Sequence, residues 1–213
     1  MFANREEAAF LLTEKLKKYK NCDGIVLAVP RGGVPMGCII SEELHIPLDV
    51  VLSKKIGHPY HKEFAIGAVT LKSRILSEGM PEVSKEYIET ETRSIRKLLQ
   101  KRYSDYYGNK KPLPLKNKIV IVVDDGIATG NTILATIAML HDEKPKKIIV
   151  AIPVAPASAL HKLQSSPFIE EVICLATPRN FQAVGQFYEN FDQVDDLQVK
   201  RLLQNREKEF DKK

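Results

Sequence analysis

The sequence predicts an α/β fold in which a central, mostly parallel sheet is flanked by helices. Short apolar runs rich in β-branched residues alternate with segments whose apolar residues recur at helical spacing. The runs have no polar side, as expected for parallel strands buried on both faces. No long Pro/Ser linker or internal repeat interrupts the pattern, so residues 1–213 should form one domain. Its core should cover about residues 1–176, and a smaller C-terminal part should cover 177–213.

The elements are expected in the order in which these patterns occur. Strands are expected at 24–29, 48–53, 119–123, 148–154 and 172–176. Helices are expected at 4–20, from about Pro35 to His45, at 84–106, from Asn131 to Leu140, at 157–163 and at 193–210. The stretch from Gly57 to about Ser84 should be loop-like, with a β-ribbon near 65–71. The apolar face of the long helix should consist of Ile88, Ile95, Leu98, Leu99, Tyr103 and Tyr106.

The composition is that of a soluble globular protein with a mild positive charge. The apolar content is 44%, the charged content is 28% and the net charge is +5, which suits anionic substrates without indicating nucleic acid. Cys22, Cys38 and Cys174 lie far apart and lack metal or redox spacing, so buried, reduced thiols in the cytoplasm are expected. The apolar stretch at 8–12 is too short for a secretion signal, and no run reaches membrane-spanning length.

The strand at 119–123 leads into a turn suited to phosphate. Two carboxylates, Asp124 and Asp125, are followed by a small-residue turn at 126–130 and by a helix from Asn131. A strand–turn–helix unit directs free backbone N–H groups and the positive end of the helix dipole to one point. Thr129 and Thr132 add hydroxyl donors. The turn lacks the Lys-Ser/Thr pair of a Walker A loop, and a simple helix cap would explain only one of the acids.

A second turn, at 30–37, follows the first strand. Arg31 can bind phosphate oxygens through two donors, and the adjacent Gly32 and Gly33 allow the backbone to approach a ligand. Because the carboxyl ends of parallel strands share one edge of the sheet, we expect this turn to lie beside the acidic turn.

The segment VVDDGIATGNT resembles the phosphoribosyl pyrophosphate loop of type I phosphoribosyltransferases. The resemblance spans nearly the whole chain. The opening Phe2-x-x-Arg5-x-x-Ala8, the segment 63–69 and the segment 178–185 look like a subgroup of predicted phosphoribosyltransferases whose acceptor is unassigned. The fold that this implies is type I phosphoribosyltransferase-like, with a flexible loop and a small C-terminal hood.

The resemblance implies the roles of the site residues. Asp124 and Asp125 would hold the ribose hydroxyls, and Arg31 and Lys55 would bind the pyrophosphate. The pyrophosphate loop, which often contains a non-proline cis peptide, would add Pro30, Gly32 and Gly33. The 5-phosphate would lie on Gly126, Ile127, Ala128, Thr129, Gly130, Asn131 and Thr132. Mg²⁺ would be the cofactor, held without a dedicated protein metal site.

Only one of Lys54 and Lys55 can readily face the site, because neighbouring residues on an extended segment point to opposite faces. Lys55 is chosen because Lys55-Ile56-Gly57 resembles the Lys-x-Gly pattern of the family. Lys54 is then expected to be solvated. His58 and His61 could form a metal pair, but loop residues are the preferred interpretation because no third ligand is in view. Glu63 is a candidate for proton transfer.

The hood, at 177–191, contains Phe181, Phe187, Tyr188 and Phe191. Phe181 is the ring assigned to stacking on an acceptor, and the others are expected to cover the sheet edge. Hypoxanthine-guanine enzymes place an acid where this chain has Ala128, which counts against a 6-oxopurine acceptor.

The predicted function is therefore a Mg²⁺-dependent transfer of ribose 5-phosphate from phosphoribosyl pyrophosphate to a small nitrogenous acceptor. The partners expected are these two substrates and no membrane, and a homodimer is left open. The alternative is a nucleotide-sensing regulator of the same fold that binds RNA through the basic helix at 84–106. A solvated helix face is the preferred interpretation of that charge.

Overall fold

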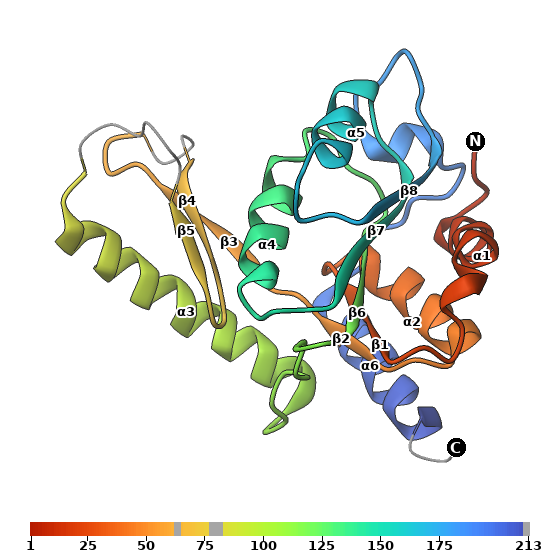
Figure 1. The fold of residues 1–213 in the computed structure, drawn as a ribbon, viewed down its shortest axis with the longest axis horizontal. Coiled ribbons are helices and arrows are strands. Elements are labelled where there is room, and N and C mark those ends of the chain that lie inside the picture. Colours follow the sequence, from red (N-terminus) through yellow and green to blue (C-terminus); the bar gives the residue numbers. More distant parts are fainter. Residues whose placement is uncertain (62–64, 77–82, 211–213) are drawn as a thin grey trace.

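A five-stranded, all-parallel sheet forms the centre of the molecule (Figure 1), in the order β2-β1-β6-β7-β8. The computed structural model describes residues 1–61, 65–76 and 83–210. The strands are β1 (Gly24–Ala28), β2 (Leu48–Val50), β6 (Ile119–Val123), β7 (Lys147–Val154) and β8 (Glu171–Ala176). The expected α/β architecture is therefore confirmed.

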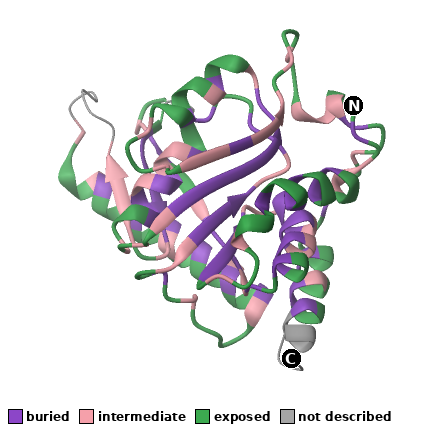
Figure 2. Ribbon diagram, turned by 45° about the vertical axis from the view of Figure 1, so that its right-hand side comes forward, coloured by how far each residue is buried: buried purple, intermediate pink, exposed green. Residues whose placement is uncertain are grey.

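Helices cover both faces of this sheet, because successive side chains of each strand point to opposite sides. On one face, Val26 and Ile121 pack against α1 (Arg5–Leu16) and α2 (Gly33–Leu44). On the other face, Val120 and Val122 pack against α4 (Asn131–His141) and α5 (Ala157–Gln164). Figure 2 shows the result, with buried strands between helices whose outer sides are exposed.

A second sheet lies beside α3 and corrects the sequence prediction for residues 48–84 (Figure 1). The apolar run 48–53 is not one strand, because β2 ends at Val50 and β3 (Ser53–Gly57) begins a separate sheet. In that sheet β3 pairs antiparallel with β4 (Ala65–Thr70), and β4 pairs with β5 (Arg74–Leu76). The β-ribbon near 65–71 is confirmed as β4, and the strand β5 was not predicted. Residues 62–64 and 77–82 of the predicted loop lie outside the described residues.

A third apolar core joins this small sheet to two long helices. The helices are α3 (Lys85–Tyr107) and α6 (Asp196–Phe210), and both contribute buried side chains to it. Short 3₁₀ helices complete the chain as η1 (Lys17–Tyr19) and η2 (Val184–Phe187). Within the described part of the chain, every helix is too short or too polar to span a bilayer.

Two expectations about individual side chains need correction. Leu98 was placed on the apolar face of α3 but is 49% exposed, whereas the adjacent Leu99 is 3% exposed. The three cysteines are half-buried instead of buried, and none forms a disulfide.

The two leucines give a matched test of this packing. We expect Leu99→Ala to lower the free energy of unfolding by about 2–5 kcal/mol, because it leaves a cavity in the third core. Leu98→Ala should change it by less than about 0.5 kcal/mol, since the side chain is largely in water. Urea denaturation of both variants measures the difference, and equal losses would contradict the packing described for α3.

Candidate active site

The two turns singled out in the sequence meet at the carboxyl ends of β1 and β6. These strands are parallel neighbours in which Ala28 is paired with Val123. The turn after β1 lies against the turn after β6 so closely that a Cβ atom on Gly32 would be 1.9 Å from Oδ2 of Asp125. A side chain at this position would collide with the Asp125 carboxylate, which Arg5 holds in place. The expected convergence of the two turns is confirmed.

The first turn has the backbone that the resemblance implies. The peptide bond between Pro30 and Arg31 is cis, and α2 begins two residues later at Gly33. Arg31 and Gly32 line one cavity together with Asp125. The guanidinium and the loop backbone are thus placed beside the acidic turn.

The second turn surrounds a cavity of about 220 Å³, which we call the phosphate-turn cavity. Gly130 has φ = +78°, a conformation that side-chain-bearing residues rarely adopt, and α4 starts at the next residue. Thr129 and Thr132 are exposed at the cavity, so their hydroxyls and the first N–H groups of α4 are available to an anion. The cavity is lined by Val29, Ser53, Asp124, Gly126, Ile127, Ala128, Thr129, Gly130, Thr132, Ile133 and Thr136.

A second cavity, of about 470 Å³, lies on the hood side of the same turn, and we call it the hood cavity. It is lined by Arg5, Arg31, Gly32, Asp125, Val184, Phe191, Gln193 and Val194. The adjacent acids therefore face different cavities: Asp124 lines the phosphate-turn cavity and Asp125 lines the hood cavity. The sequence prediction had given both acids one role on the ribose.

The two carboxyl groups form a coupled pair. The backbone N–H of Asp125 donates to Oδ1 of Asp124 over 2.9 Å. Burial, followed by the charge of Asp125, raises the pKa of Asp124 well above its ordinary value. Burial also raises the pKa of Asp125, although the nearby Arg5 guanidinium opposes the shift.

Arg5 is a site residue to which the sequence analysis gave no role. Its Nη2 and Nε atoms lie 2.8 and 2.9 Å from Oδ2 of Asp125, and Nη1 donates to the carbonyl of Asp192 over 2.8 Å. The guanidinium also lies 3.8 Å from the centroid of the Phe191 ring. Both partners of the ion pair are largely buried, so solvent screens it less than it would a surface pair.

The N-terminal segment holds the hood against the acidic turn. The N–H of Phe2 donates to the carbonyl of Phe187, and the N–H of Glu189 donates back to the carbonyl of Phe2, each over 2.8 Å. The Tyr188 hydroxyl donates to the backbone carbonyl of Asp125 over 2.7 Å. These contacts hold the hood beside the N-terminal segment, and Arg5 and Phe191 from the two segments line the hood cavity.

Other residues in the prediction lie elsewhere. Lys55 and Lys54 are both exposed on β3, and Lys55 does not line either cavity. Phe181 packs against Phe187 with ring centroids 5.3 Å apart, so Phe191 and not Phe181 is the hood ring at the cavity. Asn131 is exposed at the start of α4 and accepts from the Lys162 amine over 3.2 Å.

The remaining candidates from the sequence are His58, His61 and Glu63. The rings of His58 and His61 have centroids 6.0 Å apart. Over residues 1–61, 65–76 and 83–210 no cluster of three metal-binding side chains occurs. Glu63 lies outside the described residues.

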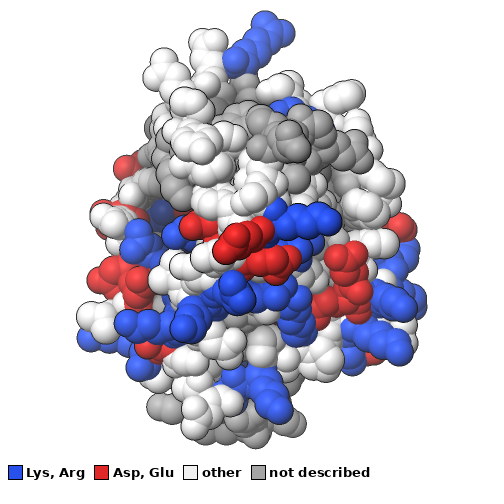
Figure 3. All heavy atoms as spheres, turned by 90° about the vertical axis from the view of Figure 1, so that its left-hand side faces the viewer, with Lys and Arg blue, Asp and Glu red and all other residues white. Residues whose placement is uncertain are grey.

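Charge on the long helix does not form a single basic surface. On the face in Figure 3, acidic and basic side chains are interspersed. Arg74 pairs with Glu89 on α3 over 2.9 Å. Such mixing is typical of a solvated helix face and unlike the one-signed patch of a nucleic-acid site.

The fold and the paired turns define an α/β protein with a candidate ligand site at the carboxyl edge of a parallel sheet. The chain belongs to the phosphoribosyl transferase domain family, whose model matches residues 3–170.

Its relatives agree with this assignment. The chain is 34% identical to TT1426 from Thermus thermophilus, with a TM-score of 0.85 over 96% of this chain and 98% of that one. A Mycobacterium tuberculosis protein from two strains, provisionally named a phosphoribosyl transferase, is 32% identical over 99% of this chain. The chain spans 48% of the length of that relative. A Neisseria gonorrhoeae protein with bound ppGpp shares the fold at 14% identity and a TM-score of 0.50.

The raised pKa of Asp124 predicts that this buried carboxylate destabilises the folded protein at neutral pH. When the pKa of a carboxyl group is higher in the folded state than in the unfolded state, the ionised group destabilises the folded protein. The destabilisation is greatest at high pH and disappears below the pKa of the unfolded state. We therefore expect Asp124→Asn to raise the melting temperature at pH 7, by roughly 2–4 °C for each kcal/mol gained. The gain should shrink as the pH falls toward the ordinary value of 3.8. The exposed Asp105→Asn is the control, and a pH-independent gain would contradict the assignment.

Proposed function

We propose that this protein transfers ribose 5-phosphate from phosphoribosyl pyrophosphate to a nitrogenous acceptor. In this reaction the bond from C1 to the pyrophosphate oxygen breaks and a bond from C1 to the acceptor nitrogen forms. The observation that carries the proposal is the contact between Gly32 and Asp125, which brings a phosphate-binding turn and an arginine-bearing turn together. Membership of the phosphoribosyl transferase domain family supports the same reaction class.

Each turn receives one end of the donor in this proposal. The 5-phosphate occupies the phosphate-turn cavity, where the backbone amides of 126–130 and the hydroxyls of Thr129 and Thr132 bind it. Asp124, which lines the same cavity, accepts from a ribose hydroxyl. The pyrophosphate lies at Arg31, with the amides of the adjacent glycines. Rate acceleration then comes from stabilising the leaving group and orienting the acceptor.

Asp125 takes a different role from its neighbour. Its Oδ2 is bound by Arg5, so we assign it to the wall between donor and acceptor. The acceptor occupies the hood cavity, bounded by Phe191 and Gln193. Ala128 at the turn counts against a 6-oxopurine, because no acid is available there to exchange a base proton.

Mg²⁺ fits the donor set of the phosphate-turn cavity. Mg²⁺ keeps several waters and needs only one or two carboxylates besides the substrate phosphates. Asp124 supplies one such oxygen donor. Its burial disfavours the negative charge, and a bound cation would stabilise that charge. When bound, the ion would neutralise negative charge on the phosphates of the donor.

The decisive experiment is pyrophosphate release from phosphoribosyl pyrophosphate and Mg²⁺ across a panel of bases and amines. Acceptor-dependent release, lost in Arg31→Ala, is expected. Calorimetry with ribose 5-phosphate provides a second readout. Absence of both release and ribose 5-phosphate binding would refute the proposal.

Lys55 and Lys54 form a matched pair for the leaving-group assignment. If Lys55 contacts the pyrophosphate, Lys55→Ala should lower turnover by about 10²-fold, as loss of one charge-stabilising donor does in other enzymes. Binding of ribose 5-phosphate should be nearly unchanged, and Lys54→Ala should behave like the wild type. Equal losses of turnover and of ribose 5-phosphate binding in Lys55→Ala would remove Lys55 from the site.

Arg5 offers a separate test of the hood cavity. Arg5→Lys keeps the charge but cannot reproduce the contacts of the planar guanidinium with Asp125, Asp192 and Phe191. We expect it to raise the KM for the acceptor at least about tenfold while changing the KM for phosphoribosyl pyrophosphate less, since about 1.4 kcal/mol corresponds to tenfold. Arg93→Lys, on the exposed side of α3, is the control. A larger effect on the donor than on the acceptor would contradict the assignment of this cavity.

A further inference from the structure

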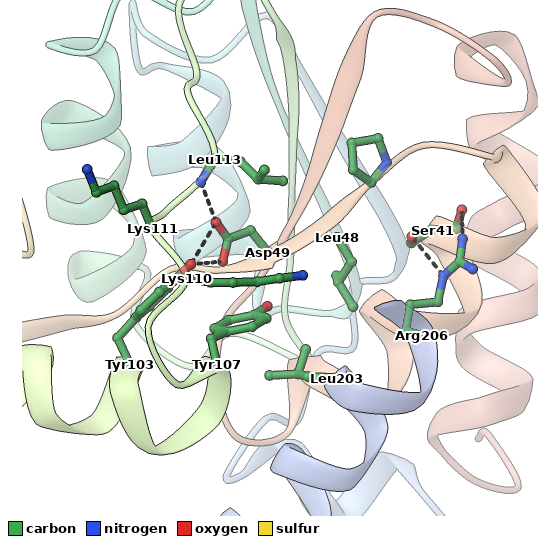
Figure 4. Close-up of a pocket in the computed structure, with 11 residues that line it drawn as sticks. Ser41, Leu48, Asp49, Tyr103, Tyr107, Lys110, Lys111, Leu113, Leu203 and Arg206 are labelled. Carbon is green, nitrogen blue, oxygen red and sulfur yellow. Dashed lines mark hydrogen bonds between the residues drawn. The ribbon is translucent and has the colours of Figure 1, made fainter. Parts of the chain in front are cut away.

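A buried polar group can serve a ligand only where the fold does not already use it. In the cavity between β2, α3 and α6 (Figure 4), the Asp49 carboxylate accepts from the Leu113 N–H over 2.8 Å and from the Tyr103 hydroxyl over 3.0 Å. In the same view, Arg206 donates from Nε and Nη2 to the hydroxyl and carbonyl oxygens of Ser41. These contacts hold α3 to β2 and α6 to α2, so the polar groups there serve the fold.

The phosphate-turn cavity contains a polar group of another kind, formed by Ser53, Thr132 and Thr136, which all line it. The Thr136 hydroxyl is placed to donate to Oγ of Ser53 over 2.8 Å and to the carbonyl oxygen of Thr132 over 2.9 Å. We call these two hydroxyls and the carbonyl the hydroxyl chain. Thr136 is 2% exposed, whereas Ser53 is half-buried. The Ser53 hydroxyl is therefore held by a buried neighbour at the wall of the proposed phosphate site.

The hydroxyl chain can run in either of two directions, because each hydroxyl carries one hydrogen. When Thr136 donates to the Thr132 carbonyl, the Ser53 hydroxyl can donate to Thr136. When Thr136 donates to Ser53, the hydrogen of Ser53 is free to point at an acceptor in the cavity. The Thr132 carbonyl keeps a partner in both arrangements, because inside α4 it also accepts the N–H of Thr136. The hydroxyl chain can thus reverse its direction without leaving that carbonyl unpaired.

An anion in the cavity favours the direction that ends on the ligand. Hydrogen bonds to an ionised acceptor are roughly twice as strong as those between neutral groups. A phosphate oxygen is therefore a better end point for the hydroxyl chain than the neutral Thr132 carbonyl. The position also fits, because the side chains of a helix slope toward its N-terminus. Thr136 thereby holds Ser53 alongside the first turn of α4, where the N–H groups of the proposed phosphate site lie.

We propose that Ser53 binds the 5-phosphate by donating its hydroxyl hydrogen to a phosphate oxygen, while Thr136 donates to Ser53. Ser53 is the first residue of β3, so the small sheet contributes a donor to a site otherwise built from the turn after β6 and the start of α4. Thr136 acts through Ser53 and is a positioning residue. The assignment rests on the proposed function, because it needs the 5-phosphate of the donor in the phosphate-turn cavity.

Isothermal titration calorimetry of the full chain with ribose 5-phosphate and with inorganic phosphate tests the assignment. Ser53→Ala should weaken the binding of both probes by a similar factor of about ten or more, as expected for the loss of one hydrogen bond to a charged group. The KM for phosphoribosyl pyrophosphate should rise by a similar factor while kcat changes little. The reason is that the 5-phosphate is bound alike in the ground state and in the transition state.

Two further variants separate the hydrogen bond from packing. Ser53→Thr keeps the hydroxyl and should bind both probes within about threefold of the wild type. Ser73→Ala is the matched control, because Ser73 is a half-buried serine between β4 and β5 of the same sheet and does not line the cavity. It should bind like the wild type. Ser53→Ala should fold normally, as judged by circular dichroism, since Thr136 retains the Thr132 carbonyl as its acceptor.

The outcomes distinguish the role of Ser53 from the proposed function. If the wild type binds both probes and Ser53→Ala binds them equally well, Ser53 is not a phosphate ligand and the proposed function stands. A loss confined to ribose 5-phosphate would place Ser53 at the sugar and overturn the assignment. A Ser53→Thr variant that folds but binds as weakly as Ser53→Ala would overturn it too. If the wild type binds neither probe, the proposed function fails, and the role of Ser53 fails with it.

Discussion

The parallel pairing of β1 with β6 is the constraint on which the candidate site depends. Because Ala28 is paired with Val123, β1 and β6 end at the same position along the sheet. The turns that follow them are therefore adjacent. Because Gly32 has no side chain, the backbone of the first turn can lie directly against the Asp125 carboxylate of the second turn. A shift of the register by one residue would move the arginine away from the acids and turn the side chains of the shifted strand to the opposite face of the sheet.

Charge is arranged around this meeting point in opposite ways on its two sides. On one side, Asp124 faces a turn of backbone amides, and its burial leaves the negative charge poorly solvated. On the other side, the charge of Asp125 is neutralised by Arg5, which is itself held by Phe191 and the carbonyl of Asp192. Two identical neighbouring residues thus acquire different chemistry from their surroundings alone.

The sequence predicted the elements whose signals are local. The Ile/Val run at 119–123 is found as strand β6, and the helix expected after the acidic turn begins at Asn131. The break between β2 and β3 was missed because Val51 and Leu52 continue the apolar run without a glycine or proline. The pairing of Arg5 with Asp125 was missed for another reason. The residues are 120 positions apart, and no periodicity links them.

The backbone ladder between residues 2–3 and 187–190 has a practical consequence for anyone who produces this protein. A purification tag fused ahead of Phe2 would lie next to the hood. Proteolytic removal of the first few residues would remove the hydrogen bonds that hold the hood to the N-terminal segment. Neither change touches the strands of the central sheet. Circular dichroism would therefore not detect a change that is confined to the hood cavity.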